Sequence, residues 1–89
     1  MHAVAVRVSV SDFESSRQHL REQVVPRVTQ APGFVAGYWT RSEDAQNGLA
    51  MVVFESEEAA RTAAENIPGM IPDTVTLQSI EVREVIEHA

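Results

Sequence analysis

The chain carries the same order of signals twice: an apolar run of strand length, then a helical segment led by a serine. Residues 2–10 (HAVAVRVSV) place a valine at every second position, and this period of two predicts a β-strand. Residues 49–54 (LAMVVF) are apolar on both faces, which is typical of a central strand. Ser11 and Ser56 follow these runs in position to cap helices. We therefore expect the chain to fold as two similar halves.

The first helix is expected to begin at Ser11, where Glu14 three residues later completes a capping box. Pro26 lacks a backbone N–H, so it should kink this helix or end its regular part. Residues 30–33 (QAPG) then end the helix. Its apolar face, which should pack against the sheet, consists of Phe13, Leu20, Val24 and Val28.

The remaining signals predict a hairpin, a second helix and a last strand. Residues 34–41 (FVAGYWTR) form the second strand, and 42–48 (SEDAQNG) form a hairpin loop in which Asn47-Gly48 supplies the positive φ. The second helix spans residues 56–67, with an acidic first turn that complements the helix dipole. Residues 74–86 form a long last strand. The inward stripe of the second helix consists of Ala60, Ala63, Ala64 and Ile67.

The resulting order, β-α-β-β-α-β, is the ferredoxin-like arrangement. Right-handed crossovers place both helices on one face of a four-stranded antiparallel sheet, with the first and third strands inside. We therefore expect an α+β fold in one domain that spans residues 1–89. The uncovered sheet face is too apolar for water, because the third strand offers apolar side chains to both sides. A second copy packed sheet against sheet would cover it, so a homodimer is expected.

Charge and composition exclude several classes of function. The formal net charge is −6, and all seven basic residues are arginines, which argues against nucleic acid as a partner. The absence of cysteine excludes disulfides and thiolate chemistry. The first ten residues contain neither a basic leader nor a long apolar stretch. No secretion signal or membrane span is therefore expected, and the cytoplasm is the expected location.

Two segments, APGFVAGYW (31–39) and VVFESEEAARTAA (52–64), resemble the antibiotic-biosynthesis monooxygenase group of the dimeric α/β-barrel superfamily. In that group a Pro-Gly-Phe opens the second strand, and an aromatic-Glu-Ser links the third strand to an alanine-bearing helix. The matching residues are Pro32, Gly33, Phe34, Phe54, Glu55, Ser56 and Ala59. The resemblance implies a dimer and a ligand pocket between sheet and helices, lined here by Val6, Val8, Val52 and Phe54. Its members include cofactor-independent oxygenases of aromatic compounds, quinol oxygenases and haem-degrading enzymes.

The residues that the haem-degrading members use are missing from this sequence. Phe54 stands where those members carry a tryptophan, and no iron-ligating histidine lies between residues 56 and 67. The first strand also lacks the asparagine that serves several oxygenase members. His2, His19 and His88 have no second ligand at helical or hairpin spacing. Neither a cofactor nor a metal site is expected.

Aromatic residues of the second and third strands are candidates for ligand binding. Phe34 belongs to the Pro-Gly-Phe motif and is expected in the core. Tyr38 and Trp39 are neighbours on a strand, so their side chains point to opposite faces of the sheet. Each either packs or contacts a ligand, because an indole or a phenol can stack on a planar substrate and offer one polar group. Phe54 joins these candidates as a residue of the implied pocket.

Two arginines complete the set of ligand-binding candidates. Arg7 lies in mid-strand opposite the valine face, toward the dimer interface or the barrel interior, and Arg17 lies on the inward side of the first helix. A buried guanidinium needs a partner of opposite charge. Each arginine therefore forms an ion pair, with Glu81 or Glu84, extends its side chain to solvent at an edge of the fold, or binds an anionic ligand.

Two functions of different class follow from these observations. The first is a cofactor-independent, monooxygenase-like enzyme for a small aromatic or quinol substrate, whose own carbanion activates oxygen. Trp39, Tyr38 and the arginines would then orient and stabilise the anion. The second is a non-catalytic homodimer that binds a small apolar or aromatic molecule or serves a structural role. The missing asparagine and histidine favour the second function, and the aromatic pair and the arginines favour the first.

Overall fold

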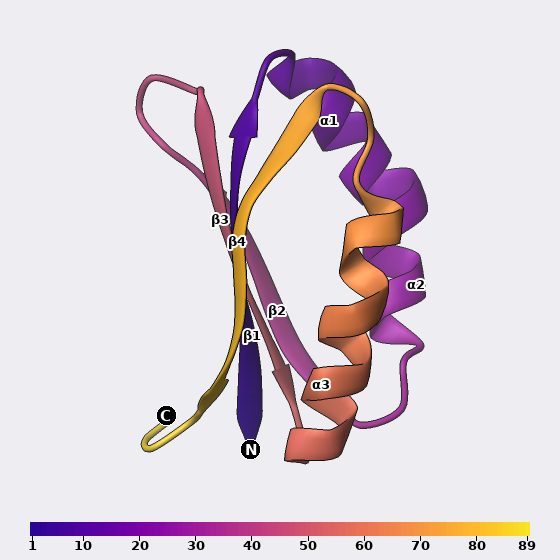
Figure 1. Cartoon of the computed structure of the whole chain (residues 1–89), viewed down its shortest axis with the longest axis vertical. Helices are drawn as coiled ribbons and strands as arrows, with labels where there is room; N and C mark the ends of the chain where they lie inside the picture. The colour runs from indigo at the N-terminus through magenta and orange to yellow at the C-terminus, as the bar shows by residue number, and fades with distance from the viewer.

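The computed structural model describes residues 1–89 and contains one antiparallel sheet in the strand order β2-β3-β1-β4. The helices cover one face of this sheet and leave the other face open (Figure 1). The first and third strands are the inner pair, so the predicted ferredoxin-like βαββαβ fold is confirmed. The strands are β1 (His2–Val10), β2 (Phe34–Arg41), β3 (Asn47–Phe54) and β4 (Val75–Glu84).

The helical part consists of two segments. The first is continuous but changes its winding twice, and the second ends in a 3₁₀ turn. No helix of the chain combines the length and the apolar character that a bilayer crossing needs. The elements are α1 (Phe13–His19), the π-helical η1 (Leu20–Val24), α2 (Val25–Thr29), α3 (Glu57–Asn66) and the 3₁₀-helical η2 (Ile67–Met70).

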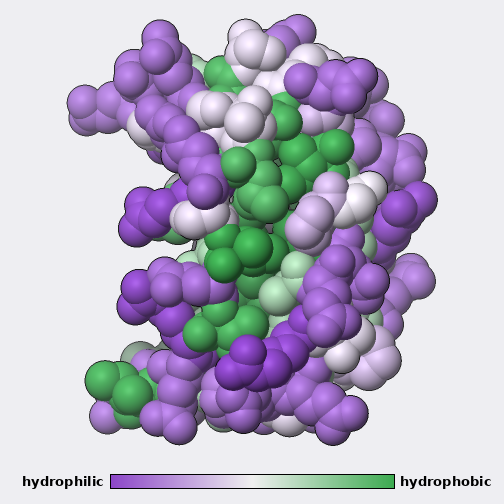
Figure 2. All heavy atoms as spheres, in the orientation of Figure 1, coloured by the Kyte–Doolittle hydropathy of each residue, from purple (hydrophilic) through white to green (hydrophobic).

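The hydrophobic core lies between the sheet and the helices. Val4 of β1 and Val52 of β3 are paired in the sheet register and, with Phe54, are fully buried. Val28 of α2 and Ala60 of α3 close this layer from the helix side. Figure 2 shows apolar side chains gathered along the seam between the two layers. As the period of two predicted, the alternating valines of β1 place one face of the strand against the core.

The N-terminus of α1 differs from the prediction by one residue. The cap is Asp12, whose side chain accepts a hydrogen bond from the Ser15 backbone N–H at 3.2 Å. Ser11, the predicted cap, instead donates its hydroxyl to the Thr74 carbonyl at 3.1 Å and ties the end of β1 to the start of β4. The prediction was wrong because serine and aspartate cap helices about equally well, so the pattern does not separate neighbours. The predicted cap of α3 is confirmed, since Ser56 accepts from Ala59 N–H at 3.1 Å.

Pro26 disturbs the first helical segment, as predicted, through a π turn. The Val25 N–H donates to the Leu20 carbonyl five residues back, in the turn directly before the proline. A proline has no N–H to donate, and its ring clashes with the carbonyl four residues earlier. The wider π turn relieves that clash while the chain continues into α2. This turn lies over the cavity described below.

The loop between β2 and β3 obtains its positive φ from Ala45 (φ 59°). The prediction that Asn47-Gly48 would supply it is wrong, because both residues already belong to β3. Gly48 meets a different need: a Cβ there would lie 3.0 Å from Val8 Cγ2 and 3.3 Å from the Thr40 carbonyl oxygen. A glycine in this strand therefore allows a close approach rather than a turn.

The two segments that carry the family resemblance pack against each other. Gly33 has φ 80°, and its carbonyl accepts a hydrogen bond from Glu55 N–H at 2.8 Å. A Cβ on Gly33 would lie 3.1 Å from Ala59 Cβ, so the turn sits directly on the first turn of α3. Phe34 and Phe54 meet edge to face, with their ring centroids 6.2 Å apart. These motif residues therefore build the fold at the end of the sheet.

Candidate functional site

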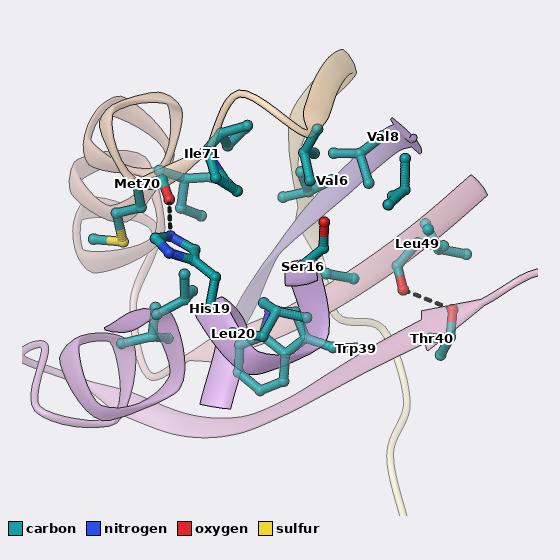
Figure 3. A pocket seen from close by; sticks show the side chains of 18 of the residues that line it. Val6, Val8, Ser16, His19, Leu20, Trp39, Thr40, Leu49, Met70 and Ile71 are labelled. Carbon is teal, nitrogen blue, oxygen red and sulfur yellow. Dashed lines mark hydrogen bonds between the residues drawn. The ribbon is translucent and has the colours of Figure 1, made fainter. Parts of the chain in front are cut away.

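A cavity of about 110 Å³ lies between the sheet and the first helical segment. Valines of β1 and β3 form its floor, α1 and η1 form one wall, and η2 with the loop that follows forms another (Figure 3). Of the 20 lining residues, 15 are hydrophobic, and none is arginine, lysine, aspartate or glutamate. The cavity is therefore suited to a small, uncharged and mainly apolar molecule.

The cavity lies beside α1 and η1, and not beneath the alanine stripe of α3. Ala60 is fully buried in the core and none of the three alanines of the stripe lines the cavity. The small side chains of α3 thus let that helix sit close to the sheet. On the other side, the larger side chains of the first segment, among them Phe13 and Leu20, hold it further away. The cavity is the space left between these two spacings.

Trp39 is the one tryptophan of the chain, and it lies in the cavity wall. Its six-membered ring folds back over Gly37, the residue two positions earlier on the same face of β2. A Cβ on Gly37 would lie 2.7 Å from Trp39 Cη2 and 2.8 Å from Cζ3. Gly37 therefore provides the room in which the indole rests against the sheet.

Three polar residues stand among the lining: Ser16 and His19 of α1, and Thr40, which is exposed near the end of β2. The Ser16 hydroxyl lies 2.8 Å from the Asp12 carbonyl and 2.9 Å from the Thr74 hydroxyl. The Thr40 hydroxyl donates to the Leu49 carbonyl at 2.7 Å, so its proton is engaged.

His19 makes a single hydrogen bond, and it joins the two helical walls of the cavity. Its Nε2 lies 2.8 Å from the Met70 carbonyl oxygen of η2, as the dashed line in Figure 3 shows. A carbonyl can only accept, so Nε2 carries the proton. The other ring nitrogen, Nδ1, has no partner within the chain.

The carboxylates with shifted pKa values lie away from the cavity. The Ser42 hydroxyl, and next the Gln46 backbone N–H, hold the pKa of Asp44 below its usual value in the hairpin loop. The hydrogen bond from Arg61, and next the charge of that guanidinium, lower the pKa of Glu57 on α3. Both carboxylates are solvent-exposed and belong to local structure. A second recess, of about 260 Å³, lies at the end of β1 and is lined mainly by short polar side chains on the surface.

The structure places one of the five predicted ligand-binding residues, Trp39, in the cavity wall. Phe54 is fully buried in the core instead, so the expectation that it lines the pocket is wrong, whereas Val6, Val8 and Val52 do line it. Tyr38 points to the open face of the sheet with 67 % of its surface exposed, opposite to Trp39 as expected. A ligand-binding role for Tyr38 stays a prediction.

Neither arginine contributes to the cavity. Arg17 is exposed, so its placement on the inward side of the helix is wrong: the buried Ser16 takes that position. Burying a guanidinium costs far more than burying one hydroxyl that keeps two hydrogen bonds, and the helix is rotated accordingly. Arg7 lies exposed on the open sheet face and forms no ion pair within the chain, since Glu81 pairs with Arg83 at 2.7 Å. Anion binding by either arginine stays a prediction.

The sequence pattern gave no role to His19 or Ser16, yet both line the cavity. A signal for them was present. Phe13, Ser16 and Leu20 follow each other at the three- and four-residue spacing of one helical face, and His19 stands beside Leu20. The two polar residues on that face could have been identified as the polar part of a site.

The chain has no group of three or more histidine, cysteine, aspartate or glutamate side chains that could hold a metal ion. Haem does not suit the cavity. About 110 Å³ is well below the roughly 300–1,000 Å³ of common ligand pockets, and the lining offers no cation for the two carboxylates of a porphyrin. The one lining histidine already uses Nε2 for Met70.

An antiparallel sheet covered on one face by two helical segments, with a cavity between the layers, defines a ferredoxin-like protein with an interlayer site. Solved structures share this fold. SnoaB, a cofactor-independent oxygenase from Streptomyces nogalater, superposes with a TM-score of 0.76 at 15% identity, over 98% of this chain and 94% of its own. A mutant of MhuD with two manganese protoporphyrin IX molecules bound per active site superposes with a TM-score of 0.68 at 16% identity. The match covers 100% of this chain and 98% of that chain.

A third structure is a monooxygenase from the gene ActVA-Orf6 of Streptomyces coelicolor in complex with nanaomycin D. It gives a TM-score of 0.62 at 17% identity, over 99% of this chain and 92% of its own. The dimeric ferredoxin-like protein of an uncultured marine organism gives 0.62 at 10% identity. No protein-family model and no curated protein matches the chain. The resemblance to the antibiotic-biosynthesis monooxygenase group is thereby confirmed at the level of the fold.

Proposed function

We propose that this protein is a cofactor-independent monooxygenase that oxidises a small quinol or phenolic aromatic bound between the sheet and the first helix. The observation that carries the proposal is the apolar cavity beside the indole of Trp39. It lies between the sheet and a helix in a fold shared with a cofactor-independent oxygenase and a second monooxygenase.

The size of the cavity selects the substrate. An engineered cavity of about 150 Å³ holds benzene, so a cavity of about 110 Å³ excludes a fused polycycle and admits a single substituted ring only if its walls move apart. A hydroquinone also satisfies the electron balance without an added reductant. One ring C–H becomes C–OH, the two phenolic hydrogens leave with the second oxygen atom as water, and the product is a hydroxyquinone.

The side chains that line the cavity have distinct parts in this reaction. The indole of Trp39 offers a flat surface on which the ring can stack, a contact that contributes about 0.5–1.5 kcal/mol beyond its buried area. Valines from β1 and β3 exclude water from the ring and admit molecular oxygen, which is itself apolar. Water exclusion also strengthens every polar contact that a substrate hydroxyl makes inside the cavity.

The open face of the sheet supports a homodimer as the working form. Leu49, Met51 and Val35 expose between 36% and 45% of their surface there or at its edge. Ala3 and Ala5 of β1 lie on the same face, where neighbouring side chains cover them, so they add little exposed apolar surface. Such a face, flanked by polar residues, is typical of a protein–protein contact, and one structure of the same fold is described as a dimer. We infer that a second copy covers this face.

A second candidate function, a non-catalytic homodimer that binds the same class of small aromatic molecule, is favoured by the lining itself. Fifteen of its 20 residues are hydrophobic, so the cavity offers many contacts and few groups able to do chemistry. The two proposals share the ligand and differ only in turnover. In both, residues 1–89 act as one domain, and the location in the cytoplasm stays a prediction.

Oxygen consumption with methylhydroquinone separates the two functions. The enzyme should consume oxygen faster than the buffer does, in the presence of a chelator and without added cofactor. Trp39→Phe should lower kcat/KM about fivefold, the equivalent of about 1 kcal/mol of stacking. Thr62→Ala, an exposed change on α3 outside the cavity, is the matched control and should have no effect.

The contrary result is equally clear. If the wild-type protein consumes no oxygen with this quinol, yet the same quinol quenches Trp39 fluorescence under nitrogen, the non-catalytic function is the correct one. Trp39 reports occupancy without ambiguity because the chain has a single tryptophan and the cavity contains it.

A further inference from the structure

We infer that His19 is the general base of this site: its Nδ1 takes the proton from a hydroxyl group on the aromatic ring of the ligand. The inference rests on the proposed function for its substrate class and adds the residue that generates the reactive anion. Three observations carry it: the position of the ring in the cavity wall, the hydrogen bond to Met70, and the unpartnered second nitrogen.

The Met70 carbonyl fixes which nitrogen of His19 is basic. Nε2 lies 2.8 Å from that oxygen, and because a carbonyl accepts only, the proton of a neutral His19 ring resides on Nε2. The lone pair is then on Nδ1. The bond also holds the ring in one orientation, since Met70 belongs to η2 while His19 ends α1. Catalytic histidines are commonly oriented in this way by a hydrogen bond to their other nitrogen.

Nδ1 is available to a ligand. It makes no hydrogen bond within the chain, and the one fully enclosed polar side-chain atom without a partner is Nδ1 of a different residue, His2. Nδ1 of His19 is thus neither engaged nor sealed in the protein interior. His19 is also the only titratable side chain among the residues that line the cavity. No other lining residue can take up a proton at neutral pH.

The proton transfer is balanced, and the two charges that it creates stabilise each other. The O–H bond of the ligand breaks, an N–H bond forms at Nδ1, and the ring becomes an imidazolium that still donates from Nε2 to Met70. The phenolate left beside it is stabilised by the imidazolium, and this attraction is strong because the walls are apolar. The electron pair stays on the ligand, which is the state from which an electron can pass to oxygen. The ligand must therefore carry a ring hydroxyl within reach of Nδ1.

The ionisation of a bound phenol tests this inference without any turnover. The probe is 4-nitrophenol, whose phenolate absorbs in the visible, at a pH below the pKa of the free compound. Binding to the wild-type homodimer should shift its spectrum toward the phenolate. His19→Gln keeps an N–H donor for Met70 and removes the basic nitrogen, so it should bind the probe but leave it protonated. His88→Gln, an exposed position outside the cavity, should behave as the wild type.

A second measurement needs no variant and covers the case in which His19→Gln does not fold. ¹⁵N NMR of the wild-type imidazoles should show His19 with its proton on Nε2 in the ligand-free protein and with both nitrogens protonated when 4-nitrophenol is bound. A proton on Nδ1 in the free protein, or a bound probe that stays neutral, would overturn the inference.

The two proposals fail separately. A phenolate signature that depends on His19, without oxygen consumption, would retain the base and refute the oxygenase. Oxygen consumption that His19→Gln leaves at the wild-type rate would retain the oxygenase and refute the base. If both hold, His19→Gln should lower kcat by about a hundredfold or more, the usual contribution of general base catalysis.

Discussion

A single methyl group added at Gly37 tests how the cavity is built. The added Cβ would lie 2.7 Å and 2.8 Å from two ring carbons of Trp39, where carbon atoms normally approach to about 3.5–4.0 Å. The indole must therefore move by roughly 1 Å or leave its seat. Gly37→Ala thus changes the cavity wall without touching any polar group of the site.

The change in the free energy of unfolding caused by Gly37→Ala follows from two opposing effects. Overpacking of this kind costs about 1–3 kcal/mol. Replacing glycine by alanine also reduces the conformational entropy of the unfolded chain, which gains about 0.4–1 kcal/mol. The cost of the clash exceeds the entropic gain, so the free energy of unfolding should fall by about 1–2 kcal/mol. The Tm should decrease by about 4–8 °C for each kcal/mol in a domain of this size.

Urea unfolding and the emission spectrum of Trp39 measure these effects together. Gly69→Ala is the matched control, since a Cβ there meets nothing within 4 Å, so it should show only the entropic gain of about 0.4–1 kcal/mol. If Gly37→Ala unfolds at the wild-type urea concentration and its emission is unchanged, the indole does not rest on Gly37. The description of the cavity wall would then be wrong.

Two further predictions concern the open face and the hairpin loop. Met51→Glu places a charge on the exposed apolar face, so it should convert the proposed homodimer into a monomer of 9.8 kDa by light scattering. A dimer that persists in this variant would show that the copies associate elsewhere. The pKa of Asp44 is lowered in the folded protein, so the ionised carboxylate stabilises the folded loop at pH values above its usual pKa. This stabilisation is lost as the pH falls through the lowered pKa. Ser42→Ala removes the largest cause, so the pKa of Asp44, followed by NMR, should rise toward its usual value; no rise would refute the role of the Ser42 hydroxyl.

The sequence predicted the fold well because its strands are patterned with period two and α3 has a clear cap. β1, with valine at alternate positions, can turn only one side to the core without exposing it, so both its register and its inner position follow. The errors are local. Ser11 and Asp12 are nearly equal as caps, and only the hydrogen bond from Ser11 to Thr74 decides between them.

The site was harder to predict because it depends on how a helix rotates and how far it stands from the sheet. Arg17 and Ser16 flank the apolar direction of α1 on either side, and helical spacing alone admits both. The cost of burying a guanidinium decides in favour of Ser16, and the same rotation moves His19 to the cavity. That one of Tyr38 and Trp39 faces the helices could be predicted, because neighbouring strand residues must face opposite sides; which of the two could not. The cavity itself arises from the unequal spacing of two helical segments, which no local pattern encodes.

Turnover of methylhydroquinone under ¹⁸O₂, analysed by mass spectrometry, shows whether the protein inserts oxygen into a small quinol, as proposed. With chelator present, the product should be a hydroxyquinone that carries one ¹⁸O atom, and the other ¹⁸O atom should appear in water. A quinone without added oxygen, or no product above the buffer reaction, would contradict the proposed function.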